Sequence, residues 1–274
     1  MSVMTSAPSP TSADALPTLL AWQAAQRGSD VAVRYKAHGL CQTSTWRSLE
    51  RAFDDARVSP AGEQPSTHAL GLAWLVRSLA KVVAEPEVSA SARQLQTSWT
   101  AHDVLWLDPQ LDLAGALRSW LQSGAVLAVG EAIDTVEVDR RALAPTVLLA
   151  EARWYDQLTA DVRARAARAR GARALLLRWA LGPALDAAQT SPSPRWLARR
   201  LVLRPVLDQL GLTCTRLALS LGQPGEHAQA LFAALQVPLC LHGHNAAART
   251  DCAQRALPND ETPRFVAESG EAHG

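Results

Sequence analysis

The stretch DVLWLDPQLDLAGALRSWLQSGAVLAVGEAIDTVEVDRRALAPTVLLA, residues 103–150, decides the fold. Short apolar runs alternate in it with helix-like segments of about ten residues, a spacing typical of βαβ units. Strands joined in this way lie parallel, and helices cover the faces of their sheet. We therefore predict an α/β fold with a mostly parallel sheet flanked by helices. The predicted strands are Val104 to Leu107, Val126 to Val129 and Thr146 to Ala150, and the predicted helices are Leu111 to Gln122 and Thr135 to Leu143.

The flanking sequence continues this pattern in both directions. On the N-terminal side, Pro17 to Arg27 predicts a helix with proline in its first turn and Gly28 past its end. A hairpin and three further helices follow before residue 103, and more helices and strands follow residue 150. The predicted elements are a hairpin of 31–35 and 41–45, helices 46–57, 68–83, 87–95, 152–170, 172–181, 195–210 and 226–235, and strands 215–221 and 237–241.

Composition divides the chain into four parts. Pro, Gly and Ser cluster over 58–65 and predict a boundary there, while the polar stretch after residue 244 predicts a poorly ordered tail. The parts are a flexible leader (1–15), a helix-hairpin-helix segment (16–65), an α/β domain (66–244) and the tail (245–274).

Charge and cysteine content exclude some classes of protein. The formal net charge of +1 argues against a nucleic-acid-binding protein, which would need a clearly basic face. Four irregularly spaced cysteines in a chain of 274 residues predict reduced thiols in a cytoplasmic protein. The first 16 residues lack the basic start and apolar run of a signal peptide. The longest apolar stretches contain charged or polar residues, so we expect no membrane span.

Several segments occur in an order found in one enzyme family. They are Leu16 to Phe53, Asp139 to Leu149 (DRRALAPTVLL), Trp154-Tyr155, the Arg-rich run Asp161 to Gly182, Trp196 to Leu210, and Leu217 to Gly243 with its Ser-x-Gly-x-Pro turn. This order resembles the long-chain acyl-CoA synthetases of the AMP-binding, adenylate-forming enzymes. The resemblance implies that the α/β domain corresponds to part of the large N-terminal domain of those enzymes.

Three features of that family are missing from this sequence. The Ser/Thr/Gly-rich loop that grips ATP phosphates has no counterpart, because the chain passes from Arg57 through 60–65 directly into the next predicted helix. The family's Gly-Tyr-Gly-x-Thr-Glu motif falls on 243–248, where alanines replace the oxygen ligands that magnesium needs. The catalytic lysine of the C-terminal domain is also absent, since the only lysines are Lys36 and Lys81.

These losses favour a protein that keeps the scaffold without the chemistry. We expect a non-catalytic binding or accessory protein in fatty-acid metabolism, whose partner is an acyl-type ligand or a full-length synthetase. The alternative is an active AMP-forming long-chain fatty acid-CoA ligase whose atypical site is completed by a second polypeptide. Only that alternative requires ATP, magnesium and coenzyme A as cofactors and substrates, and we expect no cofactor otherwise.

The resemblance places nucleotide-binding positions at Ser220, Gly222, Pro224, Gly243 and His244. Leu221 stands between Ser220 and Gly222, where the family has a second glycine that lets the backbone approach the nucleotide. A Cβ atom at that position crowds the base. We therefore expect the turn to have a structural use, and we assign no catalytic residue.

Two further patterns predict surfaces or sites of another kind. Cys240, His242 and His244 alternate along one strand face and Cys252 follows, so a zinc-binding module is a further alternative. Between Arg163 and Arg204 there are ten arginines and one acid, Asp186. Such a run is usually a solvated helical face. Beside Leu175 to Leu177 it also suits peripheral contact with an acidic membrane or the phosphates of coenzyme A.

Overall fold

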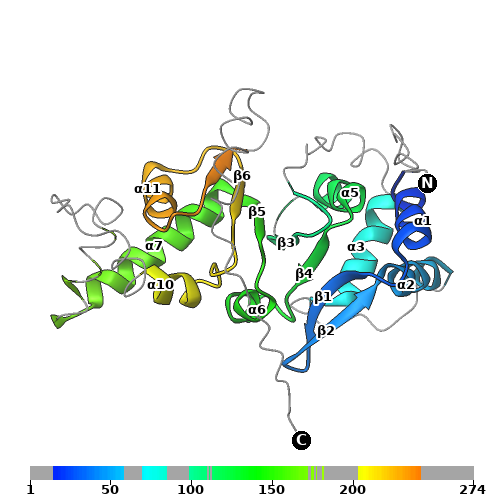
Figure 1. Cartoon of the computed structure of the whole chain (residues 1–274), viewed down its shortest axis with the longest axis horizontal. Helices are drawn as coiled ribbons and strands as arrows, with labels where there is room; N and C mark the ends of the chain where they lie inside the picture. Colours follow the sequence, from blue (N-terminus) through cyan, green and yellow to red (C-terminus); the bar gives the residue numbers. More distant parts are fainter. Residues whose placement is uncertain are drawn as a thin grey trace, which may run out of the picture.

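The computed structural model describes residues 15–58, 70–84, 99–109, 111, 113–171, 174–175, 177, 181 and 203–241. Within them, seven strands form one sheet and eight helices flank it, which confirms the predicted α/β fold (Figure 1). The strands are β1 (Val31–Ala37), β2 (Leu40–Thr45), β3 (Val104–Leu107), β4 (Val126–Val129), β5 (Val147–Glu151), β6 (Leu217–Leu221) and β7 (Leu239–Leu241).

The strand order is β2-β1-β4-β3-β5-β6-β7. All neighbouring pairs are parallel except β1 and β2, which form an antiparallel hairpin at one edge. The hairpin belongs to the same sheet as the later strands, because β1 pairs with β4, with Val33 beside Leu127 and Tyr35 beside Val129. The predicted N-terminal segment therefore extends the sheet of the α/β domain.

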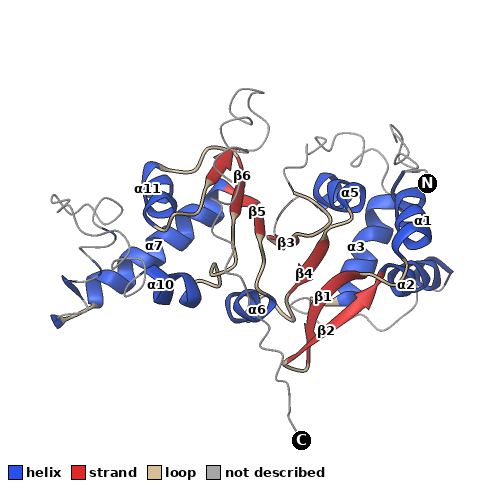
Figure 2. Ribbon diagram, viewed as in Figure 1, coloured by secondary structure: helices blue, strands red, loops and turns tan. Residues whose placement is uncertain are grey.

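Helices cover both faces of this sheet (Figure 2). The first face carries α1 (Ala15–Arg27), α2 (Trp46–Val58), α3 (Leu72–Ala84) and α5 (Leu113–Ser123). The second face carries α6 (Val136–Leu143), α7 (Ala152–Arg168), α10 (Arg204–Gln209) and α11 (Glu226–Ala234).

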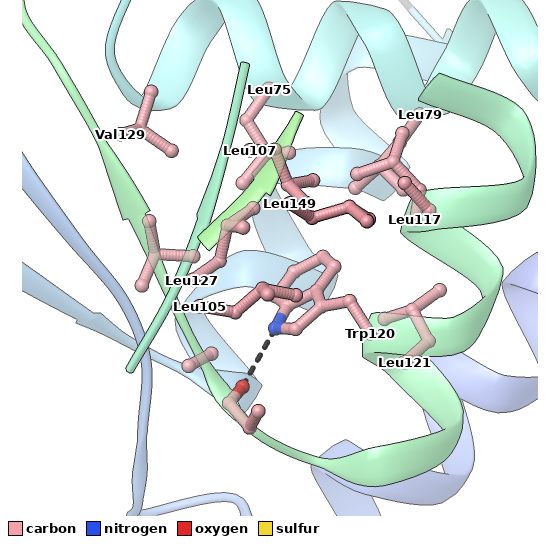
Figure 3. Packing of buried hydrophobic residues seen from close by; sticks show 14 of the residues in the cluster. Leu75, Leu79, Leu105, Leu107, Leu117, Trp120, Leu121, Leu127, Val129 and Leu149 are labelled. Carbon is pink, nitrogen blue, oxygen red and sulfur yellow. Dashed lines mark hydrogen bonds between the residues drawn. The ribbon is translucent and has the colours of Figure 1, made fainter. Parts of the chain in front are cut away.

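Two apolar clusters, one on each face, form the core. Alternate strand residues point to opposite faces, so Leu105 and Leu107 join the first cluster while Val104 and Trp106 join the second. On the first face Trp120 packs among leucines and donates a 2.7 Å hydrogen bond from Nε1 to the carbonyl of Ala125 (Figure 3). Its ring stacks on Trp46 with 5.3 Å between ring centroids. These two tryptophans therefore belong to the core of the first face.

An ion pair joins three adjacent strands at their amino ends. Asp103, immediately before β3, accepts hydrogen bonds from the guanidinium of Arg216, before β6, and from the hydroxyl of Thr146, before β5. Burial raises the pKa of Asp103, but the hydrogen bonds from Arg216, the Thr100 amide and Thr146 outweigh it, so the net pKa is lowered. The carboxylate therefore fixes the register of β3, β5 and β6.

Several predicted boundaries differ from the structure. Strand β7 begins at Leu239 instead of Val237, since Pro238 has no amide N–H and contributes its carbonyl to Ala218 instead. Helix α3 begins at Leu72, after Leu70 has donated its amide to the carbonyl of Glu131. The predicted tail and helix 87–95 lie outside the described residues, as do residues 1–14 of the predicted leader and residues 195–202 of helix 195–210. Ala15, the last residue of the predicted leader, is the first residue of α1.

Candidate functional site

The natural place for a ligand in this topology is the carboxyl end of β3. The chain leaves β3 towards α5 on the first face, but it leaves the neighbouring strands β4 and β5 towards α6 and α7 on the second face. Connections that diverge in this way open a crevice at the carboxyl ends of the strands, where doubly wound sheets bind their ligands. The candidate site is therefore the edge formed by the ends of β3, β4 and β5.

Apolar side chains close most of this edge. A small hollow lies at the ends of β3 and β4, and its walls include Trp74, Trp106, Pro109 and Val129. It has room for about one water molecule. Among the described residues, this small hollow lies at the position where a doubly wound sheet would hold a nucleotide.

A buried carboxylate beside the hollow is fully engaged. Asp139 of α6 accepts hydrogen bonds from the amide of Glu131 at 2.8 Å and from the hydroxyl of Thr135 at 2.7 Å. Its other oxygen lies 3.1 Å from Nζ of Lys36 on β1. The hydrogen bond with Asp139 raises the pKa of Lys36, so this lysine is charged and paired with the buried carboxylate.

Glu131, which follows β4, ties the hairpin to the sheet. Its carboxylate oxygens accept the backbone amides of His38 at 2.7 Å and Gly39 at 2.9 Å. These two residues form the turn between β1 and β2, and both have positive φ, 53° and 74°. Two amides converging on one carboxylate make a charge-assisted contact, so Glu131 holds the tip of the hairpin.

An arginine is buried on the second face beside two neighbouring aromatic rings. Arg140 of α6 is 1% exposed, and its guanidinium carbon lies 5.3 Å from the ring centroid of Trp106 and 5.0 Å from that of Trp154. Its Nε donates a 3.0 Å hydrogen bond to the carbonyl of Leu210. Burial lowers the pKa of Arg140 to about 10, so it still carries its charge at neutral pH. The cation is held by ring faces and a backbone carbonyl.

The same aromatic cluster continues into α7 and α11. Tyr155 is fully buried, with its hydroxyl donating a 2.9 Å hydrogen bond to the carbonyl of Leu219 on β6. Trp154 and Phe232 both meet its ring edge to face. Burial raises the pKa of Tyr155 well above its ordinary value, so the hydroxyl stays protonated. This arrangement locks α7 and α11 onto the sheet.

The positions assigned through the resemblance are only partly within the described residues. Ser220 is buried at the end of β6, and its hydroxyl donates a 2.9 Å hydrogen bond to the carbonyl of Gly222. Gly222 has φ of +99°, and Pro224 offers its carbonyl to the amide side chain of Gln229 at 2.8 Å. Gly243 and His244 lie outside the described residues, so their nucleotide contacts stay predictions.

The turn after β6 is also fastened to α7. The amide of Gly225 donates a 2.8 Å hydrogen bond to Asp156, one helical turn beyond the start of α7. All three polar contacts of this turn thus end on groups of the protein itself, in line with the structural use expected for it.

The described residues offer few ligands for the alternative zinc site. No group of three or more metal-binding side chains occurs in that part of the chain. Cys240, on β7, is engaged in a disulfide, which removes its sulfur as a thiolate ligand. His242, His244 and Cys252 fall outside the described residues. The expectation of four reduced thiols is wrong for Cys240, whereas Cys41 and Cys214 are free and exposed.

The described part of the Arg-rich segment lies at the end of α7. Arg165, Arg168 and Arg170 are exposed there, and Leu175 beyond them is 68% exposed. Arg165 lies 3.6 Å from Glu137 of α6, an exposed ion pair. The remainder of the segment up to Arg204 is mostly outside the described residues, so its contact with a membrane or a phosphate stays a prediction. Among the helices that the structure describes, none is long and apolar enough to cross a bilayer.

The buried pair Asp139 and Arg140 was missed by the sequence reasoning. Both residues belong to a run of charges on a predicted helix, and such runs normally face solvent. The available signal was their position in the helix, one turn before the buried Leu143. No protein-family model matches the chain, and no curated protein sequence matches it significantly.

Proposed function

We propose that this chain is a non-catalytic accessory protein of fatty-acid metabolism, built on an AMP-binding acyl-CoA synthetase scaffold, that acts by binding another polypeptide. The observation that carries the proposal is the pairing of the cations at the candidate site, the edge formed by the carboxyl ends of β3, β4 and β5. Among the described residues, Lys36 is paired with Asp139, and the guanidinium of Arg140 lies against the rings of Trp106 and Trp154.

The pairing of Lys36 bears directly on ATP chemistry. An adenylating enzyme needs a cation that is free to follow the charge on the phosphates. Moving Lys36 towards a phosphate would leave the carboxylate of Asp139 buried without its cation, which is costly. Arg140 is equally committed, since its guanidinium lies against two neighbouring tryptophan rings and donates a hydrogen bond to the carbonyl of Leu210. Both cations therefore suit a structural role better than a catalytic one.

The closed edge also bears on the choice of partner. An acyl chain or a nucleotide needs a concave pocket of several hundred Å³, and the hollow that the described residues form at this edge has room for about one water molecule. A protein partner needs only exposed surface. These considerations support a polypeptide, such as a full-length synthetase, in preference to an acyl ligand.

ATP–pyrophosphate exchange tests the proposal. The purified chain is incubated with Mg·ATP, labelled pyrophosphate and medium- to long-chain fatty acids, of about 8 to 18 carbons. We expect no exchange of label into ATP above the protein-free background. Exchange that depends on both fatty acid and protein would instead support the AMP-forming ligase. A second arm adds the chain to a full-length acyl-CoA synthetase, where a saturable change in that enzyme's rate supports an accessory role.

A further inference from the structure

In the part of the chain that the structure describes, β2 is an edge of the sheet and no strand pairs with its outer side. Its residues Leu40 to Thr43 are all exposed, and Leu40, at 68%, is among the most exposed large apolar side chains of the described chain. An edge strand presents a row of unpaired backbone groups that invites another strand. Natural proteins protect such edges with lysine, proline or a bulge. Strand β2, LCQTST, contains no charged residue and no proline, and the register shift of the hairpin lies on β1, between Val31 and Val33.

The register of the hairpin shows which backbone groups face outward. His38 and Gly39 form a two-residue turn with both φ values positive, so the flanking pair Ala37 and Leu40 is hydrogen-bonded. Hydrogen-bonded and non-bonded pairs alternate along an antiparallel ladder. Gln42 is therefore bonded to β1, while the N–H and C=O groups of Cys41 and Thr43 point away from it.

These outward groups are self-complementary. A two-fold axis through Gln42 would place Cys41 of one copy opposite Thr43 of the other, and the reverse. Both pairs would then be hydrogen-bonded, giving four backbone bonds with no change in either hairpin. The same register puts Leu40 opposite Ser44, which would shield part of its exposed side chain.

Charge does not oppose this pairing. The strand itself is neutral, so no like charges meet directly across the axis. The cations of the neighbouring strand β1, Arg34 and Lys36, lie one strand further back. Their counterparts in the second copy would be three strand spacings away, roughly 14 Å. That separation exceeds the Debye length of about 8 Å at physiological ionic strength.

We propose that this protein forms a symmetric dimer in which β2 of each copy pairs antiparallel about Gln42, joining the two seven-stranded sheets into one. The ladder is short, and stable interfaces bury about 1,600 Å². The dimer is therefore in equilibrium with monomer, and its fraction rises with protein concentration. The proposal does not depend on the accessory function given above.

Charge exchange at Gln42 tests the pairing. By analytical ultracentrifugation, the unaltered chain should show a concentration-dependent dimer. Gln42→Lys places two ammonium groups opposite each other and should raise the dissociation constant about tenfold, as should Gln42→Glu. An equimolar mixture of the two variants should restore dimer as the heterodimer. This rescue also shows that neither variant has lost its fold.

A designed disulfide tests the register. In a Cys41→Ser, Cys214→Ser background, Gln42→Cys would place two thiols in a non-hydrogen-bonded pair with Cα atoms about 4.5 Å apart, within the range for a disulfide. We expect rapid oxidation to a covalent dimer. The matched control is Asp55→Cys, an exposed position on α2 away from the edge, which should stay monomeric under the same conditions.

Three results would overturn the proposal. They are a protein that stays monomeric at all concentrations, a dimer indifferent to Gln42→Lys, and a Gln42→Cys variant that crosslinks no faster than the control. A monomer that instead captures a foreign strand peptide at β2 would show that the edge serves another protein.

Discussion

Replacing Asp103 by asparagine tests the claim that one carboxylate fixes three neighbouring strands. Its side chain is 6% exposed, and it accepts hydrogen bonds from Arg216, Thr146 and the amide of Thr100. Asparagine has nearly the same shape, but it keeps only one acceptor oxygen and turns an amide N–H group towards the guanidinium. The substitution therefore removes the charge and half of the acceptors without creating a cavity.

The magnitude follows from the exposure of the two partners. Removing one member of a fully buried ion pair costs about 3–5 kcal/mol. Arg216 is 35% exposed and regains water, so the loss is smaller than that. Each hydrogen bond to a charged group is worth about 1.5–3 kcal/mol, and one acceptor remains. We expect Asp103→Asn to lower the free energy of unfolding by about 2–3 kcal/mol.

The effect should also depend on pH in a defined direction. The folded protein holds the pKa of Asp103 below its ordinary value of 3.8. Above that value the carboxylate is ionised in both states, and its stabilisation is fully present. As the pH falls below 3.8, the unfolded chain takes up the proton first, so stability is lost until the folded carboxyl also protonates. Asp103→Asn should lack this component of the acid loss.

Urea denaturation at pH 7 and across the acid range measures both effects. The matched control is Asp30→Asn, which breaks the exposed pair of Asp30 with Arg27, where Asp30 is 51% exposed. Pairs of this kind contribute about 0–1 kcal/mol. A loss for Asp103→Asn no larger than that of the control would refute the reasoning.

The remaining predictions concern other contacts of the fold. Gly211→Ala should lower the melting temperature, because Gly211 has φ of +66° and a Cβ there would lie 2.8 Å from the amide nitrogen of Arg141; an unchanged temperature would contradict this. Glu131→Gln should weaken the hold on the hairpin turn by about 1 kcal/mol, seen as faster amide exchange at His38 and Gly39. The basic end of α7 should bind anionic lipid, so the protein should co-sediment with vesicles that contain it. Replacing Arg168 and Arg170 together by glutamine should weaken this binding by about 2 kcal/mol. Equal binding to neutral vesicles would contradict an electrostatic contact with the membrane.

The central strands were predictable because strands buried on both faces appear in the sequence as continuous apolar runs. Strands β3 and β4 occur at the predicted residues, since each is a continuous run of four apolar side chains between helix-like segments. The order of the strands in the sheet could not be predicted from a sequence pattern of this kind. Nothing in Val31 to Tyr35 indicates that β1 lies beside β4, because pairing is decided by how the helices pack and not by the strand's own residues.

The candidate site was less accessible to sequence reasoning. Asp139 and Arg140 are adjacent charges on an amphipathic helix, and such residues usually face solvent. They are buried because residues distant in the sequence contact them. Lys36 of the hairpin pairs with Asp139, and Trp106 of β3 and Trp154 of α7 lie against Arg140. Contacts over such separations cannot be inferred from local pattern. The Ser220 turn was assigned only through the resemblance, so its role stays a prediction.

Equilibrium dialysis of labelled ATP and AMP against the purified full chain, with magnesium and at protein concentrations up to about 100 μM, tests the proposed loss of nucleotide handling most directly. We predict equal nucleotide concentrations on both sides of the membrane, because the cations at the carboxyl edge are already paired. Saturable retention of either nucleotide, weakened by Ser220→Ala or Gly222→Ala, would contradict the account.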